Sequence, residues 1–521
     1  MFKSLSALFL MLVVAPAAAQ QDILILKDGR AFDNARMEVA AGGYKLTFEH
    51  GGVFVPDDLI EGAYLADGGA QEYQPQNESE REKLARGLVP FRGKWMNEGK
   101  RKKELDKFIK QMRAEIADMD AHKEWRDRYK VKTKYFNFEH TLPPHVFARY
   151  SRTMEAYFAA FCKEWKVKPQ KGYADNPKET RLKVCFYRDE GDFHQVSGAN
   201  SNVLGYFRFV KPLELDIYYD RLSDEDSTEV MFHEANHYLQ KLINVKFSYP
   251  HFPGESLAEY YGASHWNDET ESLETGLILE GRLTEVQTEM AKGIMMDIEE
   301  LITTERMYQH YTWGWTLVHF LMSDKRYAKK FKKFYVGLAH DKKVPRKKMG
   351  IDGLSTLSQE DVLPVFMRYL GIKNMEELQE LEAEWHEYVK HELEVTSSHG
   401  LEKAAENALR YNRKLRAKRL YQEAIDTGEA SALAYHRYAD FLVNGGADSS
   451  DVSGDEIEGL WRKAIELDPL TGRFYAALGW YLQEHNQIEE GQRLMRLAVD
   501  IEPDDREVAK TLERMRKGGD D

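Results

Sequence analysis

Two stretches near the C-terminus repeat one pattern at an interval of 34 residues. "WRKAIELDP" begins at Trp461 and "MRLAVDIEP" begins at Met495, so that Ala464 matches Ala498 and a proline closes both copies. Self-similarity at this period is typical of stacked helical hairpins, in which small residues let neighbouring helices approach and a proline ends each unit. The repeat therefore predicts an all-α region over 396–515.

An earlier copy of the pattern precedes these two. Tyr421 and Ala424 in "LYQEAID" fit the same register, and the insertion "GGADSSDVSG" lengthens the next interval to 40 residues (461 − 421). Small residues where helices cross and a proline at each end resemble tetratricopeptide repeats. The resemblance implies a C-terminal module that binds a protein partner or a substrate.

The composition and the N-terminus limit the kind of protein. The formal net charge of −14 over 521 residues argues against general affinity for nucleic acid or anionic membranes. The apolar run "LSALFLMLVV" follows Lys3 and leads into "APAAAQ", which predicts a signal peptide over 1–19, cleaved near Ala19. Since no later segment reaches 18 continuous apolar residues, we expect a periplasmic or secreted protein without a transmembrane segment. In such a compartment, Cys162 and Cys185 either form a disulfide or remain two buried thiols.

The region between the signal peptide and residue 130 divides in two. Residues 20–70 predict a small β domain, because the turn pairs Asp28-Gly29 and Gly51-Gly52 separate β-prone runs. Residues 71–130 predict a polar linker and a charged helix. The apolar residues of that helix recur at helical spacing: Leu105, Phe108, Ile109, Met112, Ile116 and Met119.

Strands and helices alternate in the long middle region, 131–395. The predicted strands are "KYFNFEH", "RLKVCFYR", "LGYFRF" and "ELDIYYD", and a helix is predicted over 144–166. From 226 onward the pattern is dominated by helices. The middle region is therefore predicted to mix α and β structure.

A helix that Asp226 can cap, with Glu229 completing a capping box, carries a histidine pair. His233 and His237 lie four residues apart in "MFHEANHYLQ", and Glu234 follows the first. Residues at this spacing share a helix face, so both imidazoles can bind one ion. Zn²⁺ suits neutral imidazoles and needs a third protein ligand beside a water, from which Glu234 can take a proton. A structural histidine pair is the alternative, so the third ligand decides.

The segment "HFPGESLAEYYG" offers that ligand. It breaks at Pro253-Gly254 and then becomes helical, which puts Glu255 in its first turn with 17 residues between it and His237. Glu259, one turn later, faces the same way. Its carboxylate can accept a hydrogen bond from the second ring nitrogen of a ligating histidine, the support that such sites usually have.

HExxH followed by a glutamate at this distance resembles the gluzincin metallopeptidases. The likeness is closest to bacterial peptidase-MA-like families, including a domain of unknown function often fused to tetratricopeptide repeats. It is carried by "RLKVCFYRDEGDF", "LGYFRF", "EVMFHEANHYL", "FPGESLAEYY" and "YTWGWTLVHFL". The resemblance implies a zincin-like α+β domain over 131–395, with His233, His237 and Glu255 as zinc ligands and Glu234 as general base.

Two positions beside the third ligand depart from the family pattern. Phe252 stands where the family often has tryptophan, and Ser256 stands where it usually has glycine. Neither change removes a ligand. Both concern the shape of the site.

Such a hydrolase also needs a hydrogen-bond donor for the oxyanion that forms at the attacked carbonyl. "RMYQHYTWGWTLVHFLM" offers Tyr308, His310, Tyr311 and His319. The resemblance favours Tyr311, and core packing is the alternative. In gluzincins an edge strand near the zinc pairs with the substrate backbone. The resemblance therefore places Gly205 and Tyr206 of "LGYFRF" beside the substrate, again with core packing as the alternative.

Together these features predict an α+β chain with a small β domain, a charged helical segment, a zincin-like domain and an all-α repeat domain. The leading functional prediction is an exported zinc peptidase whose repeats bind a protein. A non-catalytic protein that binds polypeptides or serves as a scaffold is one alternative. A zinc amidase acting on a cell-wall component is the other.

Overall fold

The computed structural model describes residues 22–65, 75, 77–91, 94–171, 178–201, 203–267, 270, 272–351, 353–444 and 452–518. The predicted signal peptide, 1–19, lies outside these residues. Internal contacts divide the chain into two units, one of Met1–Ala117 with Leu482–Asp521 and one of Asp118–Tyr481. The chain mixes helices with small sheets and is all-helical toward its C-terminus, as the sequence predicts.

The second unit is built on a five-stranded sheet. Its strand order is β12-β13-β11-β10-β9, with three parallel central strands and an antiparallel strand at each edge. The bounds are Tyr129–Lys132 for β9, Phe136–His140 for β10, Leu182–Tyr187 for β11, Gly205–Arg208 for β12 and Glu214–Tyr218 for β13. β11 is almost wholly buried, as expected of a central parallel strand covered on both faces. All four predicted strands are confirmed.

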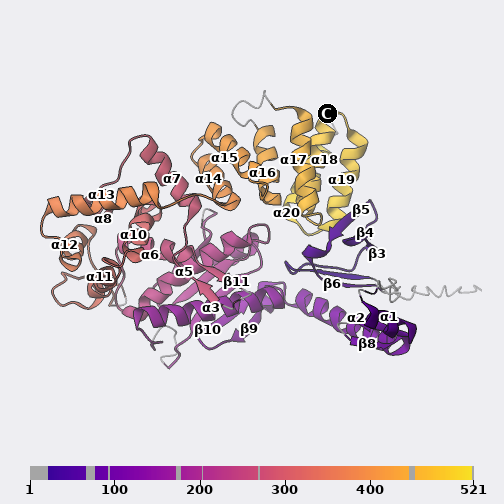
Figure 1. Ribbon diagram of the computed structural model, residues 1–521, viewed down its shortest axis with the longest axis horizontal. Helices are drawn as coiled ribbons and strands as arrows, with labels where there is room; N and C mark the ends of the chain where they lie inside the picture. Colours follow the sequence, from indigo (N-terminus) through magenta and orange to yellow (C-terminus); the bar gives the residue numbers. More distant parts are fainter. Residues whose placement is uncertain are drawn as a thin grey trace, which may run out of the picture. The chain divides into compact units, whose positions relative to one another are not determined.

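Helices cover both faces of this sheet (Figure 1). Helices α3 (Pro144–Trp165) and α5 (Asp224–Ile243) share one large core with the inward residues of β10, β11 and β13. α4 (Glu190–Ser197) packs on the opposite face, where Phe193 lies against Cys185 and Tyr187. α3 confirms the helix predicted over 144–166. α5 is therefore fixed to the sheet along its apolar side, which leaves its other side for the site.

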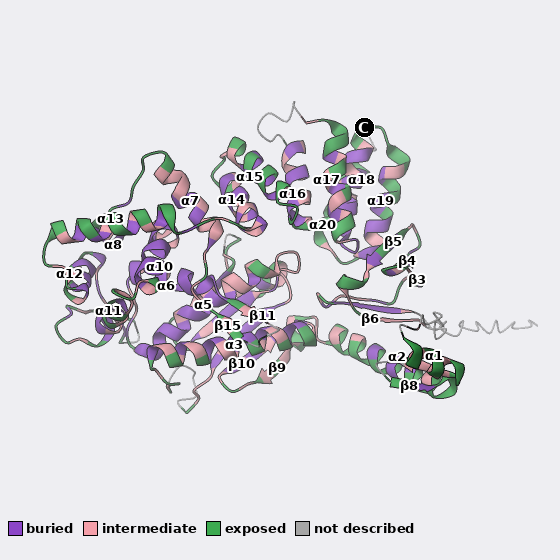
Figure 2. Cartoon of the chain, in the orientation of Figure 1, coloured by how far each residue is buried: buried purple, intermediate pink, exposed green. Residues whose placement is uncertain are grey.

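Helices and two small hairpins follow α5. They are α6 (His251–Gly262), β14 (His265–Asn267), β15 (Ser272–Glu274), α7 (Glu280–Ala291), α8 (Ile298–Thr303), α9 (Met307–Gln309), a π-helix (His310–Gly314), α10 (Trp315–Ser323), α11 (Ala328–His340), β16 (Lys347–Lys348), β17 (Ser355–Thr356), α12 (Gln359–Leu370) and α13 (Met375–His391). Figure 2 shows α5 and α10 largely buried, whereas α13 exposes one face.

The C-terminal helices follow the repeat read from the sequence. They are α14 (Ser398–Arg410), α15 (Lys414–Asp426), α16 (Ala432–Val443), α17 (Gly454–Leu467), α18 (Gly472–Glu484), α19 (Ile488–Ile501) and α20 (Arg506–Gly518). α17 and α19 begin 34 residues apart (488 − 454), and α15 and α17 begin 40 apart (454 − 414). Trp461 and Ala464, two of the repeated positions, are fully buried. The sequence repeat thus corresponds to the interval between equivalent helices, α15, α17 and α19, of successive helix pairs.

The first unit contains the N-terminal strands and the last two helices. Its two three-stranded sheets contain β1 (Ile23–Leu26), β2 (Ala31–Phe32) and β6 (Ile60–Tyr64), and β3 (Arg36–Ala40), β4 (Gly43–Thr47) and β5 (Gly52–Pro56). A 3-10 turn (Asp57–Leu59), α1 (Glu78–Ala85), β7 (Leu88–Phe91), β8 (Lys94–Asn97) and α2 (Glu98–Ala121) follow. The turn between β4 and β5 contacts α19, because the His50 backbone N–H donates to Asp500 at 2.8 Å. The predicted Asp28-Gly29 turn lies between the paired strands β1 and β2, and Gly51 lies in the turn between β4 and β5, whereas Gly52 already begins β5.

Two local predictions at the helix starts are wrong. Ser223 is the residue before α5, and Asp226 forms an ion pair with Lys403 at 2.7 Å instead of capping the helix. α6 begins at His251 and continues through Pro253-Gly254. Proline is tolerated there because first-turn amides have no partner within the helix.

The cysteines are two free thiols, with Cys185 buried and Cys162 half-buried. Burial raises the pKa of both, that of Cys162 to about 11. Within the described part of the chain, no helix has the length and apolar character that crossing a bilayer requires.

The core between α3 and the sheet gives the first prediction. Phe158 is fully buried and stacks on Tyr135. Phe158→Ala should lower the free energy of unfolding by about 3–5 kcal/mol, because it leaves a cavity among packed aromatics. Leu415→Ala removes a side chain that is 72% exposed and should change that free energy little. Urea unfolding followed by circular dichroism measures both, and equal effects would contradict the assigned core.

Candidate metal centre

Two helices bring three potential ligands to one point. His233 and His237 project from adjacent turns of α5, and Glu255 projects from α6. α6 lies close to α5 at Gly262, where a Cβ would be 3.7 Å from Cγ of Glu229 and 3.9 Å from Cβ of His233. The Nε2 atoms of the two histidines are 3.3 Å apart, and Oε2 of Glu255 lies 3.4 Å from that of His233 and 3.2 Å from that of His237.

These distances allow a direct test of whether the three residues fit zinc. Ligand atoms at ~2.0–2.1 Å from a tetrahedral ion are ~3.3 Å from one another. All three observed separations lie within 0.1 Å of that value, since they run from 3.2 to 3.4 Å. The donor set of two imidazoles and one carboxylate also suits zinc. The residues therefore fit the ion in both chemistry and spacing.

Glu259 lies behind His233, on the side opposite the ligand atom. Its Oε1 is 3.6 Å from Nδ1 of His233, and its other neighbour is Arg282 of α7, whose guanidinium donates to it at 3.1 Å. Glu259 is only 4% exposed, so its charge needs a cation close by. Arg282 supplies that cation and holds the carboxylate facing the imidazole.

Glu234 faces the edge strand of the sheet. The backbone N–H of Phe207 in β12 donates to its carboxylate. Gly205 of the same strand passes so close to α5 that a Cβ there would lie 2.8 Å from a methyl group of Val230. The edge strand and the general-base candidate are thus held side by side, and Gly205 lines the adjoining cavity.

Tyr206 does not join this arrangement through its side chain. Its ring packs with Phe193 of α4, on the other face of the sheet, and its hydroxyl bonds to buried Asp216. Burial, together with the charge of Asp216, raises the pKa of Tyr206 to about 12. Only its backbone lies along the free edge, so the core-packing alternative describes its side chain.

Tyr311 is an oxyanion-donor candidate whose ring contacts one of the candidate ligands, His233. Its ring centroid is 5.9 Å from that of His233, and the Arg282 guanidinium lies 5.5 Å from it on the ring face. Burial, with Glu255 and Glu259 close by, raises the pKa of Tyr311, so its hydroxyl stays protonated and able to donate.

The other three candidates have different surroundings. His310 is buried and its Nε2 lies 3.1 Å from the Thr304 carbonyl oxygen, while His319 contacts Tyr388 and the carbonyl of Gly276. Neither lines the cavity. Tyr308 does line it, and its buried hydroxyl has no hydrogen-bond partner among the described residues.

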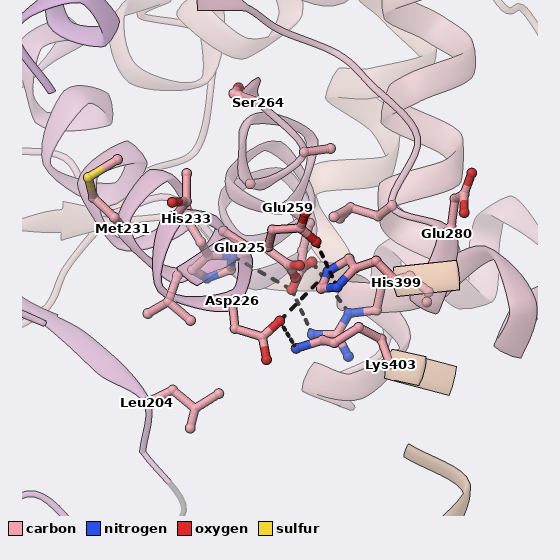
Figure 3. Close-up of a pocket in the computed structure, with 18 of the residues that line it drawn as sticks. Leu204, Glu225, Asp226, Met231, His233, Glu259, Ser264, Glu280, His399 and Lys403 are labelled. Atoms are coloured by element: carbon pink, nitrogen blue, oxygen red, sulfur yellow. Dashed lines mark hydrogen bonds and ion pairs between the residues drawn. The ribbon is translucent and has the colours of Figure 1, made fainter. Parts of the chain in front are cut away.

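A cavity of about 840 Å³ opens beside the candidate metal ligands. His233, Glu234 and Tyr311 line one part of it. The opposite wall comes from α14, the first helix of the repeat region, where Lys403 pairs with Asp226 and His399 with Glu225 at 2.8 Å (Figure 3). The cavity is large enough for several side chains of a substrate.

Charges within the site shift the pKa values of its groups. Burial acts to lower the pKa of His233, but the hydrogen bond with Glu255 and the charge of Glu259 outweigh it and raise that pKa to about 9. Burial raises the pKa of Glu234, which the two histidines partly offset. For Glu255, burial acts upward, but His237 and His233 together hold the pKa well below its usual range. The ligand carboxylate is therefore ionised, whereas the base candidate has a stronger tendency to hold a proton.

Several residues of this site carry no recognisable signal in the sequence. Arg282 lies 23 residues after its partner Glu259, on another helix and beyond a hairpin. His399 and Lys403 belong to the repeat region. No motif spacing links them to the histidine pair, because their approach depends on how α7 and α14 pack.

Comparison with models of known protein families gives no match for this chain, and comparison with curated proteins gives none. The likeness to gluzincin peptidases rests on the quoted residues alone.

The His233 pKa gives a prediction for the protein treated with a chelator. An exposed histidine has a pKa of about 6.5, so a folded-state value of about 9 means that the proton stabilises the fold. This stabilisation is complete below pH 6.5 and is lost as pH rises through 9. With a chelator present, the melting temperature of the protein should therefore decrease as the pH rises from 6.5 to 9.5. His233→Asn should flatten that profile, and unchanged slopes in the variant would contradict the assignment.

Proposed function

We propose that this protein is an exported zinc-dependent peptidase of the gluzincin type, whose C-terminal helices are tetratricopeptide-like repeats that bind a protein substrate or partner. The observation that carries the proposal is the triangle of ligand atoms from His233, His237 and Glu255, with all sides between 3.2 and 3.4 Å. Glu234 beside it and the cavity in front of it supply what a hydrolase needs further.

In this proposal His233, His237 and Glu255 hold the ion. Zinc bound there supplies a Lewis acid that activates water and polarises a carbonyl. Glu234 takes a proton from the attacking water as the new C–O bond forms, and it later delivers that proton to the amine when the C–N bond breaks. The raised pKa of Glu234 suits both steps, since the group must accept a proton and also release it. The Tyr311 hydroxyl donates to the oxyanion.

The free edge of β12 supports a polypeptide as substrate. Among the described residues β12 pairs with β13 alone, so its outer edge has no strand partner there, and only the Phe207 N–H is taken by Glu234. An extended peptide added there would run past Glu234, because the strand already contacts that residue through Phe207. Gly205 keeps the strand close to α5.

The position of α14 supports a role for the repeats in substrate binding. The two residues that precede α14 are held by Glu280 of α7, which accepts from the backbone N–H groups of Thr396 and Ser397 at 2.9 and 2.8 Å. Together with the Asp226–Lys403 pair, this contact makes α14 a wall of the cavity. We infer that the first repeat helix touches the substrate.

The central test measures zinc content and cleavage in the same samples. The purified protein should hold about one zinc per chain and cleave an unfolded protein. Glu234→Gln should abolish cleavage and keep the zinc, because it removes the proton acceptor and no ligand. His237→Ala should lose both. Elemental analysis and a quenched-fluorescence peptide assay report the two properties.

Glu387→Gln, an exposed position on α13, serves as the matched control and should change neither property. Zinc loss in Glu234→Gln would contradict its assigned role. Zinc bound without cleavage of any peptide or cell-wall digest would favour the scaffold alternative. Cleavage confined to the cell-wall digest would favour the amidase.

A further inference from the structure

Ser256 directly follows Glu255, the third candidate ligand. It is fully buried in α6, and its hydroxyl donates to the main-chain carbonyl of His310 at 3.1 Å. His310 begins the π-helix that carries Tyr311 as its second residue. One hydrogen bond therefore joins the helix of Glu255 to the turn of Tyr311.

The π-helix explains why this bond matters. A π-helical turn contains one residue more than an α-helical turn and displaces the carbonyls around it from their ordinary partners. The Ser256 hydroxyl donates to a carbonyl of this turn, and a hydrogen bond to a buried carbonyl stabilises the conformation that presents it. The bond therefore ties the π-helical turn to α6.

Gly314, at the end of the π-helix, has no side chain and so leaves room for the Ser256 hydroxyl. A Cβ at that position would lie 2.1 Å from Oγ of Ser256. The hydroxyl therefore occupies the space that any larger residue would need. A serine on α6 and a glycine on the π-helix form a matched pair.

The same turn is also held from its other side. Arg282 lies over the ring of Tyr311 and bonds to Glu259, which faces His233. One series of contacts thus runs from His233 through Glu259 and Arg282 to Tyr311. A second series runs from His310, which precedes Tyr311 in the chain, through Ser256 to α6. Both series of contacts are needed to fix the Tyr311 hydroxyl relative to the ligands.

We propose that Ser256 is a positioning residue that sets the Tyr311 hydroxyl against the metal centre by holding the π-helical turn. The inference rests on the proposed function, because it assigns Tyr311 to the reaction. Ser256 itself touches neither ion nor substrate.

The test is a double-mutant cycle on the zinc-loaded protein. Ser256→Ala should lower kcat about five- to tenfold and leave KM and zinc content unchanged, because the ligands stay and only the donor is misplaced. Tyr311→Phe should lower kcat about 100-fold. Ser256→Ala added to Tyr311→Phe should cost almost nothing more, since both act through one hydroxyl. Thr288→Val removes a hydroxyl that donates within α7 at 2.7 Å and should not change kcat.

A second measurement tests the contact without using activity. Gly314→Ala should lower the melting temperature, because its methyl group would meet the Ser256 hydroxyl. Ser256→Gly combined with Gly314→Ala should recover most of that loss. An equal loss with and without Ser256 would overturn the contact.

The outcomes of the cycle separate the two proposals. If the unaltered protein shows no zinc-dependent cleavage, the proposed function fails and this inference fails with it. If cleavage is present and depends on Glu234, but the effects of Ser256→Ala and Tyr311→Phe multiply, only the positioning role is overturned. A parallel loss of zinc in Ser256→Ala would also overturn it, since the serine would then act on the ligand.

Discussion

Four carboxylates lie within one largely buried space, and the rest of the site follows from the need to balance their charge. Glu229, Glu234, Glu255 and Glu259 project from two helices that pack against each other. Carboxylates held apart from water are stable only beside cations, hydrogen-bond donors or protons. Glu259 has Arg282, and Glu255 has the two histidines. A divalent ion among the ligand atoms would complete this balance.

The packing of α5 explains why the groups can be held so closely. One side of the helix is locked into the core with α3 and the sheet, so its polar side cannot rotate away. α6 packs against it near Gly262 and carries both Glu255 and Glu259 on successive turns. The geometry of the site thus derives from apolar contacts that take no part in the chemistry.

Much of this was predictable from the sequence, because it depends on spacing within single elements. The four strands around the sheet and helix 144–166 follow from runs of apolar and β-branched residues, and the structure agrees. The approach of His233 to His237 needs only a helix. Glu255 was predictable because the 17 intervening residues are enough to end one helix, reverse the chain and begin the next.

The rest depends on tertiary contacts that no local pattern records. Aspartate is a common helix-capping residue, but the carboxylate of Asp226 forms an ion pair with Lys403 of α14 instead. Ser256 was visible only as a departure from the family pattern, and its meaning depends on Gly314, far along the chain and on another helix. Tyr206 faces away from the site because alternate residues of a strand point to opposite faces.

The attachment of α14 also bears on how such chains can change through evolution. Glu280 holds the start of the repeat region, and Asp226 on the histidine-bearing helix holds its second turn. Recombination at a linker could therefore not exchange the repeat region or the histidine-bearing segment without losing these contacts. A repeat array imported from elsewhere would leave two half-buried acids, Asp226 and Glu280, without their cation and donors. Coupled inheritance of both halves is the consequence.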